Sequence, residues 1–549
     1  MKESDGHQVA SESPGDDVPP VESSTTSSPE QESPPEPLSR YERFHRLLRR
    51  DFLVGGVSPR YFITRWIFLR FLGIIHVIAF LSIWVQLSGL IGSRGIAPVN
   101  LFLELVQSRT GIDRYWKLPT LCWLNSSDWF LHAICGSGLF FAVVLVLGYA
   151  PPLCLAMLYV LYLSLVSVAP DFLAFQWDTL LLEATFLAIF FAPMQWRPNI
   201  AREQVHSRVM LLLLRWLLFR LMFMSGVVKL DDVTWRNLTA LNFHYETQPL
   251  PTVIGWYFHQ LPEWFHRVSV ASALTIELLV PFLVLAPRRL RGISAVFLIA
   301  FQVIIMATGN FTFFNLLAIA LCLLLIDDRH WRGVLPKRAV AWLNPPETIR
   351  PLPFYRKAFM GGIAVLIALI TGSHMAQLLP NSSGPPALLF PLVQRAYPYY
   401  IANRYGLFAH MTTNRPEIIV EGRGPDGEWN AYEFKYKPDN LDEAPHRVAP
   451  HQPRLDWQMW FATFRPRPPA WFLNFCYRLL QGEPDVLALL DENPFPDEPP
   501  IEVRALRYEY RMTDIATKRE TGNWWSRELV GEFIPPMRLE QQSDPEPPG

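Results

Sequence analysis

The chain has 549 residues, of which 50% are hydrophobic and 13% aromatic, and its formal net charge is -1. This composition argues against an ordinary soluble enzyme or a disordered chain and indicates a membrane protein with attached polar parts. A net charge near zero provides no field that would recruit nucleic acid. The five scattered cysteines include no CxxC pair, so they signal neither a disulfide framework nor a zinc site.

Both ends of the chain have the composition of disordered segments. Residues 1–39 are rich in Ser, Pro and Glu and nearly lack large apolar side chains, and residues 537–549 have the same character. Such segments cannot bury enough apolar surface to fold, so we expect both to be disordered. The ordered part then divides into a multi-pass transmembrane domain at 40–380 and an extramembrane domain at 381–536.

Apolar runs of membrane-spanning length follow one another through the first of these domains. They lie at 62–85, 133–148, 152–168, 179–193, 209–228, 268–286, 293–308, 311–326 and 358–379. The fourth, seventh and eighth runs are short, so one of them is either re-entrant or takes extra length from its flanks. We therefore predict an α-helical multi-pass domain of about nine transmembrane helices.

Basic residues between the runs predict the orientation. With nine spans, four clusters fall on the same side of the membrane, and cytoplasmic loops are the ones enriched in Lys and Arg. The clusters are Arg40, Arg43, Arg46, Arg49, Arg50 and Arg60; Arg197, Arg202 and Arg208; Arg288, Arg289 and Arg291; and Arg329, Arg332, Lys337, Arg338, Arg350, Arg356 and Lys357. This predicts a cytoplasmic N-terminus and a C-terminal domain on the outer, lumenal side.

The C-terminal domain has the pattern of a mixed β/α fold. Segments 417–420 and 431–436 flank a Pro-Asp-Gly turn and predict a hairpin. Segments 455–464, 470–481 and 485–490 predict short helices, and 501–512 predicts a half-buried strand.

Polar and aromatic residues gather on the predicted outer face, most densely in the stretch SGVVKLDDVTWRNLTALNFHYETQPLP at 225–251. The candidate cluster is Trp177, Asp178, Glu183, Arg220, Lys229, Trp235, Arg236, Asn237, His244, Tyr245, Glu246 and Gln248. Ionisable residues inside spans are costly, so they are either functional or paired. Counting the helical rise from the outer ends puts Glu183 about 8 Å deep, Arg220 about 12 Å and Glu277 about 14 Å, which allows Arg220 to pair with either acid.

Two residues of this cluster have alternative interpretations. Asp178 begins the fourth run, where an aspartate is a preferred helix N-cap, and Trp177 beside it suits the membrane interface. Lys229 ends the fifth run, where it is either a snorkelling interfacial lysine or a base whose pKa is lowered in an apolar pocket. The spacing of His244 and Glu246 does not match a metal site.

The sequence lacks three common motifs of catalytic and nucleotide-binding sites. It contains no GxSxG, HExxH or GxxxxGK[ST]. One GxGxxG occurs at Gly422, Gly424 and Gly427, but it lies in the predicted hairpin turn and opens no helix, so we interpret it as a turn. We assign no catalytic residue, metal or cofactor.

Several long segments resemble the lipase maturation factor family. They include FQWDTLLLEATFLAIFFAP at 175–193, FHYETQPLP at 243–251, RLDWQMWFA at 454–462 and GNWWSR at 522–527. The resemblance implies a multi-pass protein, of the endoplasmic reticulum in animals, that helps dimeric lipases such as lipoprotein lipase fold and assemble. It implies client contact through the C-terminal region and no catalytic residues. A bacterial member would lie in the cytoplasmic membrane with an unknown client.

Four tryptophans of the C-terminal domain are candidates for that contact, because aromatic residues anchor interfaces. They are Trp457, Trp460, Trp524 and Trp525; the alternative is that they form the core of the domain.

The membrane half also resembles, more distantly, the vitamin K-dependent carboxylases, in which a Lys-Leu pair followed by Asp and Trp closes a helix. The matching residues here are Lys229, Leu230, Asp232 and Trp235. This resemblance implies, as an alternative function, a membrane enzyme acting on a lipid or protein substrate with Lys229 as base. A transporter is a third hypothesis, although the two halves show no repeat symmetry.

Overall fold

Long apolar helices form the first part of the fold. The structure is a computed structural model that describes residues 60–343, 351–378 and 384–539. Within these residues, seven helical segments are long and apolar enough to cross a membrane. They are α2 (Phe62–Trp84), α6 (Asp128–Leu147), α7 (Pro151–Val168), α10 (Arg208–Lys229), α14 (Glu263–Leu278) continued by the 3-10 helix η3 (Val280–Leu285), α15 (Arg288–Thr308) and α19 (Phe354–Ala376). The chain is thus a multi-pass membrane protein.

The other two predicted spans form shorter, largely buried helices, α9 (Gln176–Phe191) and α16 (Phe314–Leu323). The seventh predicted run is not short, because α15 has 21 residues. The short α16 is stabilised at its C-terminal end by two arginines. Arg215 Nη2 donates to Leu324 O at 2.9 Å and Arg291 Nε to Leu325 O at 3.1 Å. These donors satisfy helix-end carbonyls that have no intrahelical partner, which allows a short helix inside the bundle.

Short elements connect the long helices. On the side of the C-terminal domain they are α3 (Leu87–Ile91), α4 (Val99–Arg109), α5 (Arg114–Lys117), η1 (Leu121–Trp123), α8 (Pro170–Leu173), α11 (Val233–Arg236), α12 (Leu241–His244), α13 (Val253–His259), α20 (Phe390–Ala396) and η4 (Tyr397–Tyr399). The others are η2 (Ile200–Arg202), α17 (Asp328–Val334) and α18 (Lys337–Leu343).

The C-terminal part is built on an antiparallel four-stranded sheet of order β2-β1-β5-β6. Its strands are β1 (Arg415–Arg423), β2 (Trp429–Ala431), β5 (Glu502–Met512) and β6 (Trp525–Met537), and β3 (Glu433–Phe434) pairs with β4 (Leu490–Glu492). Helices α21 (Arg454–Ala462), α22 (Ala470–Leu480), α23 (Pro484–Leu487) and α24 (Ile515–Thr521) complete it. The predicted mixed β/α class is confirmed.

The elements predicted for this domain match the observed helices and strands to different degrees. The predicted hairpin is β1–β2, and Gly427 N donates to Gly424 O across its turn at 3.1 Å. The helix predicted at 485–490 ends at Leu487, and Leu490 already begins β4. The long strand β6 was not predicted from the sequence.

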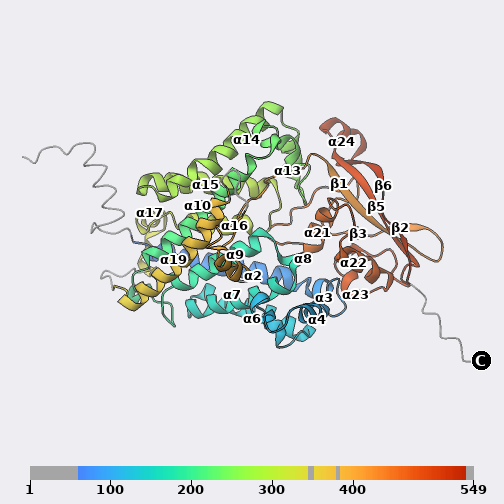
Figure 1. Cartoon of the computed structure of the whole chain (residues 1–549). Coiled ribbons are helices and arrows are strands. Elements are labelled where there is room, and N and C mark those ends of the chain that lie inside the picture. Colours follow the sequence, from blue (N-terminus) through green and yellow to red (C-terminus); the bar gives the residue numbers. More distant parts are fainter. Residues whose placement is uncertain (1–59, 344–350, 379–383, 540–549) are drawn as a thin grey trace, which may run out of the picture. The chain divides into compact units, whose positions relative to one another are not determined.

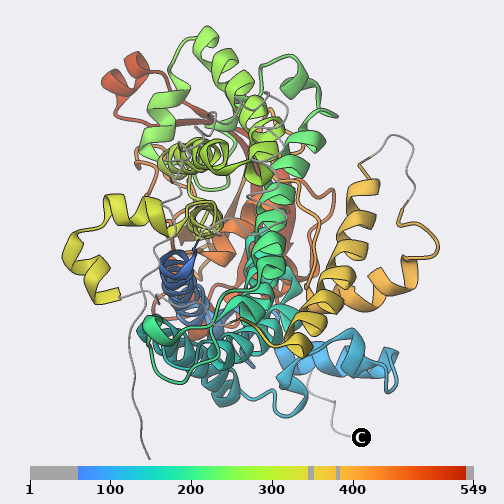
Figure 2. The ribbon, with the colours of Figure 1, turned by 90° about the vertical axis from the view of Figure 1, so that its left-hand side faces the viewer.

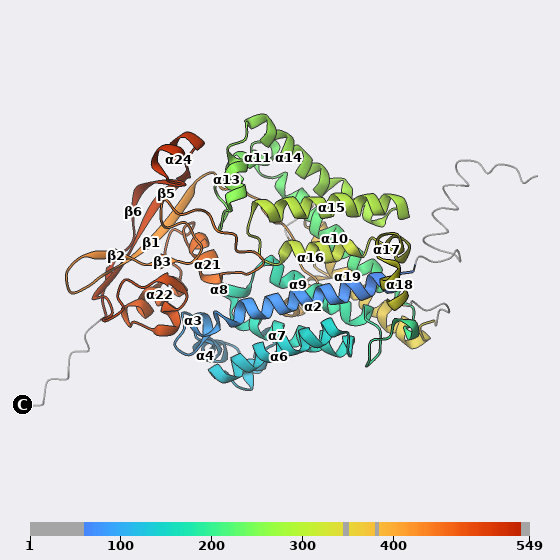
Figure 3. The same cartoon turned by 180° about the vertical axis from the view of Figure 1, so that it is seen from behind.

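The two ends of the helices differ in what they contact (Figures 1 and 3). At one end, which we call the inner end, the loops with the predicted basic clusters meet: Asp328 Oδ2 accepts from Phe62 N at 2.9 Å, and Arg356 Nη1 donates to Gln204 Oε1 at 2.8 Å. The C-terminal domain packs on the opposite end, which we call the outer end. The predicted disordered segment 1–39 and the boundary at 380/381 lie outside the described residues.

Candidate functional site at the outer ends of the helices

A buried ion pair joins the membrane helices to the C-terminal domain. Asp178, near the start of α9, and Arg454, the first residue of α21, are both 0% exposed. Arg454 Nη2 donates to Asp178 Oδ1 at 3.0 Å and Nη1 to Oδ2 at 3.2 Å. Tyr162 of α7 donates to the same carboxylate at 2.5 Å. The N-cap prediction for Asp178 is therefore wrong: Phe175 caps α9, and the carboxylate holds a partner 276 residues away.

Amide side chains make further contacts across the same boundary. Trp177 Nε1 donates to Gln452 Oε1 at 2.8 Å, and Gln452 N donates to Ser82 Oγ of α2 at 2.9 Å. Asn310, between α15 and α16, accepts from Val448 N at 2.8 Å and donates to His446 O at 2.7 Å. Asn310 is 2% exposed. These bonds fix the chain before α21 against the outer ends of three helices.

A second buried pair lies deeper among the helices. Arg220 of α10 bonds Glu183 of α9, which confirms that Arg220 is within reach of one of the two predicted acids. The segment after η4 completes this site: Asn403 N donates to Glu183 Oε2 and Tyr405 Oη to the same oxygen, both at 2.8 Å. Arg220 lies nine residues, or about 14 Å, before the outer end of its helix.

The linker after α19 thus returns to the bundle before it enters the β-sheet domain. Tyr159, in the middle of α7, donates to Tyr399 O at 2.5 Å, and Arg220 Nη1 donates to Asn403 O at 2.8 Å. The charges inside the helices satisfy the backbone of this linker, as buried polar groups require. The sequence-based domain division assigned residues 397–405 to the extramembrane domain, whereas their partners are membrane helices.

Lys229 is paired with the other acid. Its amine lies 2.7 and 2.6 Å from the two carboxylate oxygens of Glu277 on α14, and 5.0 Å from the centre of the Trp235 ring. Lys229 is 3% exposed and Glu277 6% exposed. Both oxygens of the Glu277 carboxylate accept from this amine, so the pair joins α10 to α14.

The stretch after Lys229 folds into a platform beneath the sheet. Asp232 caps α11, accepting from Thr234 N at 2.8 Å. Glu246 Oε2 accepts from Met512 N of β5 at 2.9 Å, and Arg415 of β1 donates to the carbonyls of Glu246 and Gln248. This platform is the part of the membrane domain that receives the β-sheet.

The remaining predicted residues of this stretch are packed or exposed. Tyr245 is 5% exposed, and the half-buried His244 ring packs on Phe408 with ring centres 5.2 Å apart. Arg236 and Asn237 are exposed and lie outside the contacts just described. Burial lowers the pKa of His244 to about 4, so this imidazole is neutral at physiological pH.

Two buried aspartates of the C-terminal domain have a pKa shifted in the opposite direction. Burial raises the pKa of Asp456 to about 6, although the Tyr436 and Lys437 backbone amides bond the carboxylate. Burial likewise raises the pKa of Asp439 to about 7, against the attraction of Lys437 beside it. No cluster of three or more His, Cys, Asp or Glu suited to a metal occurs in the described part of the chain.

The four candidate tryptophans divide into two groups. Trp457 and Trp525 are 3% and 1% exposed, so they belong to the core and offer a client no surface. Trp460 and Trp524 are half-buried. Trp460 packs on Phe464, with ring centres 4.6 Å apart. Through Phe461 it joins a cluster of aromatic rings that begins inside the protein at Trp177, Phe175 and Trp457.

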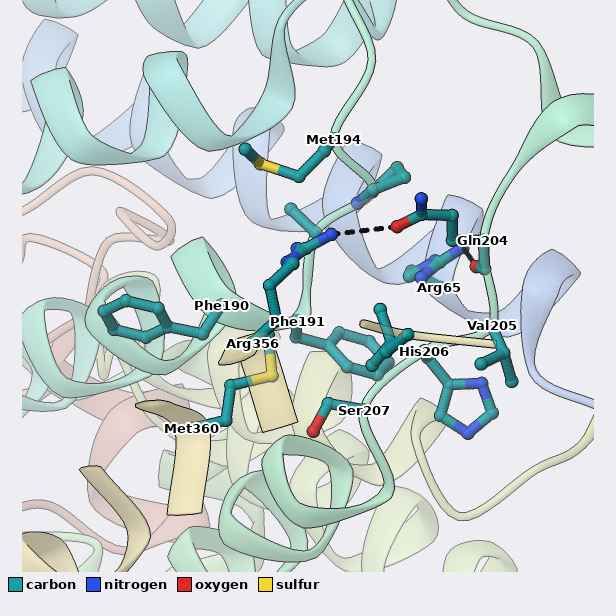
Figure 4. A pocket seen from close by; sticks show the side chains of 13 residues that line it. Arg65, Phe190, Phe191, Met194, Gln204, Val205, His206, Ser207, Arg356 and Met360 are labelled. Atoms are coloured by element: carbon teal, nitrogen blue, oxygen red, sulfur yellow. Dashed lines mark hydrogen bonds between the residues drawn. The ribbon is translucent and has the colours of Figure 1, made fainter. Parts of the chain in front are cut away.

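A pocket at the inner end is remote from these residues (Figure 4). Its walls include Phe190, Phe191 and Met360, and two arginines face it. Arg356 bonds the Gln204 side chain at 2.8 Å, and Arg65 bonds the Gln204 carbonyl at 2.9 Å. Both guanidinium groups are therefore already partnered within the protein.

Comparison with known proteins identifies the family. The model "Lipase maturation factor transmembrane domain" matches residues 63–333, and "Lipase maturation factor C-terminal domain" matches residues 401–535. Lipase maturation factor 1 of Mus musculus is 35% identical over 531 residues, which cover 89% of this chain and 91% of the mouse protein. The chain belongs to the lipase maturation factor family.

Other relatives of this lipase maturation factor extend over similar lengths. Lipase maturation factor 2 of Gallus gallus is 36% identical, with 88% of this chain and 82% of the relative covered. Lipase maturation factor 1 of Homo sapiens is 34% identical, with 88% and 89% covered. No solved structure matches the chain.

Sequence reasoning missed several residues that join the two parts of this lipase maturation factor. Arg454, Arg415, Gln452 and Asn403 were not among the predicted site residues, although each bonds one that was. Arg454 lies in the quoted segment RLDWQMWFA. The available signal was an arginine among apolar residues in that segment. Such an arginine is expected to be buried, and a buried arginine needs an acidic or polar partner.

Proposed function

We propose that this protein is a membrane-embedded maturation factor that helps secreted dimeric lipases, such as lipoprotein lipase, to fold and assemble. The observation that carries the proposal is that the family similarity extends over both the helices and the C-terminal domain. The two are held together by buried polar contacts such as Asp178–Arg454. A domain attached in this way presents its outward surface in a fixed position above the membrane.

The orientation follows from the distribution of basic residues. The described members of the basic clusters, among them Arg60, Arg288 and Arg332, lie at the inner end, and the C-terminal domain packs at the other end. Cytoplasmic loops are enriched in Lys and Arg, so we infer that the C-terminal domain faces the lumen of the endoplasmic reticulum. Secreted lipases fold in that compartment, where their incompletely buried apolar surfaces are accessible.

The client contact that we favour is the exposed end of this aromatic cluster. Phe461 and Phe464 are 37% and 43% exposed, and Trp460 lies between them with ring centres 5.0 and 4.6 Å away. Aromatic side chains supported from below by a rigid core lose little entropy on binding, which makes them effective anchors. We infer that this tip, Trp460–Phe461–Phe464, binds apolar surface of a partly folded lipase, in the manner of a chaperone.

Co-expression with a secreted lipase tests this function. Cells without other lipase maturation factors would express lipoprotein lipase with this protein or with the variant Phe461→Glu/Phe464→Glu. We expect the native chain to raise secreted active lipase dimer and the variant to lower that yield by about tenfold, the effect of losing an anchor worth roughly 1.4 kcal/mol.

A matched control uses an exposed aromatic residue at the inner end. Trp196 is 76% exposed, and Trp196→Glu replaces an exposed aromatic side chain by a carboxylate without touching the outer domain. We expect this variant to retain full activity. Equal yields of active dimer from all three proteins at equal expression would reject the proposed contact, and no gain from the native chain would reject the function.

A further inference from the structure

A second exposed apolar surface lies between α3 and α6. It belongs to residues 99–124, which contain α4, α5 and η1. Five large apolar side chains of this segment are exposed: Leu101 by 56%, Leu105 by 48%, Ile112 by 81%, Trp116 by 74% and Leu124 by 80%. Large apolar side chains exposed in this number on one short segment mark an interaction site on a soluble domain or contact with lipid on a membrane protein.

Hydrogen bonds to α7 determine the depth of this segment. Thr120 Oγ1 donates to Ser164 O and Leu121 N to Ser164 Oγ, both at 3.0 Å. Ser164 lies four residues before Val168, the outer end of α7, which is about 6 Å toward the bilayer centre. Residues 120–121 are therefore level with the last turn of a spanning helix, where the lipid headgroups and the first acyl carbons lie.

The segment also continues directly into the lipid-facing surface of α6. Leu124 precedes the start of α6 at Asp128 by four residues, and Trp129 in the first turn of α6 is 65% exposed. In Figure 2 the light blue ribbon of this segment extends sideways from the helices rather than along them. An element with this direction and depth runs parallel to the membrane surface.

The side chains suit such a position. Trp and Tyr are enriched at the boundary between headgroups and acyl chains, and here Trp116 and Tyr115 are exposed. Arg114 lies 4.8 Å from the centre of the Tyr115 ring and 5.4 Å from that of Trp123. Lys117 is also exposed, and its amine lies 3.3 Å from Asp113 Oδ2. Basic and aromatic side chains side by side are typical of segments that lie in the membrane interface.

We propose that residues 99–124 form an interfacial anchor that lies in the outer leaflet, with Leu101, Leu105, Ile112, Trp116 and Leu124 inserted among the lipids. Its partner is the lipid surface, since the segment is continuous with helices that already face lipid. The anchor fixes α3, which follows α2 and contacts α23 of the C-terminal domain through Gly89, and so couples that domain to the plane of the membrane.

Site-directed fluorescence of the full-length protein tests this anchor. The cysteines at 122, 135, 154, 322 and 476 are all buried, so an environment-sensitive maleimide dye reacts preferentially with an added cysteine. The dye is placed at Ile112→Cys or Trp116→Cys, with Glu428→Cys in the exposed β1–β2 turn as control. Each labelled protein is inserted into nanodiscs of zwitterionic phosphatidylcholine, with or without a shallow spin label on the lipid acyl chain.

We expect the spin-labelled lipid to quench the dye at 112 and 116 about fivefold more strongly than at 428, as insertion at the boundary between headgroups and acyl chains requires. Aqueous iodide should quench the dye at 428 the most. Equal iodide quenching at all three positions would overturn the proposal. Protection of 112 and 116 from both quenchers would also overturn it, because a protein would then cover the segment.

Discussion

The ion pair between Asp178 and Arg454 is the contact whose loss should have the largest effect on the junction between the two parts. The two side chains are 0% exposed, and Arg454 also donates to Phe172 O at 2.5 Å. Arg454→Met removes the cation and leaves the Asp178 carboxylate buried without a positive partner, although Tyr162 still donates to it. Breaking a buried pair from one side costs about 3–5 kcal/mol.

A double-mutant cycle separates the pair from its surroundings. Asp178→Asn removes the acid's charge at nearly constant shape, and the double variant Asp178→Asn/Arg454→Met removes both charges. We expect each single substitution to cost about 3 kcal/mol or more, and the double to cost less than the sum by about 1.5–3 kcal/mol, because contacting residues couple.

Hydrogen exchange of α21 in detergent micelles measures these costs. The amides of Trp457 to Ala462 exchange when α21 leaves the helices, and a loss of 3 kcal/mol multiplies that opening about hundredfold. Exchange that rises by less than about threefold in both single variants, or a coupling below about 0.5 kcal/mol, would refute the assignment of this pair as the main contact of the junction.

Three further changes probe neighbouring features. Burial lowers the pKa of His451 from its ordinary 6.5 to about 4. Between these two pH values the unfolded chain binds a proton that the folded chain does not, so stability is lost as the pH falls from 6.5 toward 4. The melting temperature of His451→Gln should therefore decline less between pH 7.5 and 5 than that of the native chain. Lys229→Met should lower the melting temperature because it leaves Glu277 buried and unpaired, and Lys229→Met/Glu277→Gln should restore much of it and retain lipase maturation. Gly89→Ala makes its new Cβ clash with Asp485 O and should destabilise the outer domain by about 1–3 kcal/mol in hydrogen exchange. Gly361→Ala, with nothing within 4 Å of the added Cβ, should have no such effect.

Each of these changes has an outcome that contradicts its reasoning. An identical pH dependence in His451→Gln would show that this imidazole is not the group that resists protonation. Complete loss of lipase maturation in a stable Lys229→Met/Glu277→Gln protein would argue for lysine chemistry and for the carboxylase-like alternative. Equal hydrogen exchange in Gly89→Ala and Gly361→Ala would show that the approach of α23 to α3 is not tight.

Elements governed by local pattern were predicted well from the sequence. The long spans and the β1–β2 hairpin follow from run length and from the Pro-Asp-Gly turn, which are local properties. Strand β6 has no such signal: residues Ser526 to Val530 are exposed, so the strand lacks the alternation of a half-buried strand, and two prolines lie near its end. The strand forms because its backbone pairs with β5, a contact that the local sequence pattern does not indicate.

Partner choice among buried charges was beyond local reasoning. The predicted depth of about 14 Å for Glu277 assumed that every helix starts at the same level, but Glu277 meets Lys229 at the outer end of α10. Helix α14 begins at Glu263, so its first turns extend past the outer end of α10. Asp178 illustrates the same limit, because a helix-start aspartate predicts a cap unless its distant arginine is known.

The proposed function depends most on direct contact between the C-terminal domain and the lipase. A photoreactive amino acid placed at Phe464, on the exposed aromatic tip, and at Trp196, at the inner end, tests this in cells that secrete lipoprotein lipase. We predict a crosslink to newly made lipase from position 464 and none from position 196. Crosslinking from position 196, or none from 464 while lipase maturation proceeds, would contradict this direct contact.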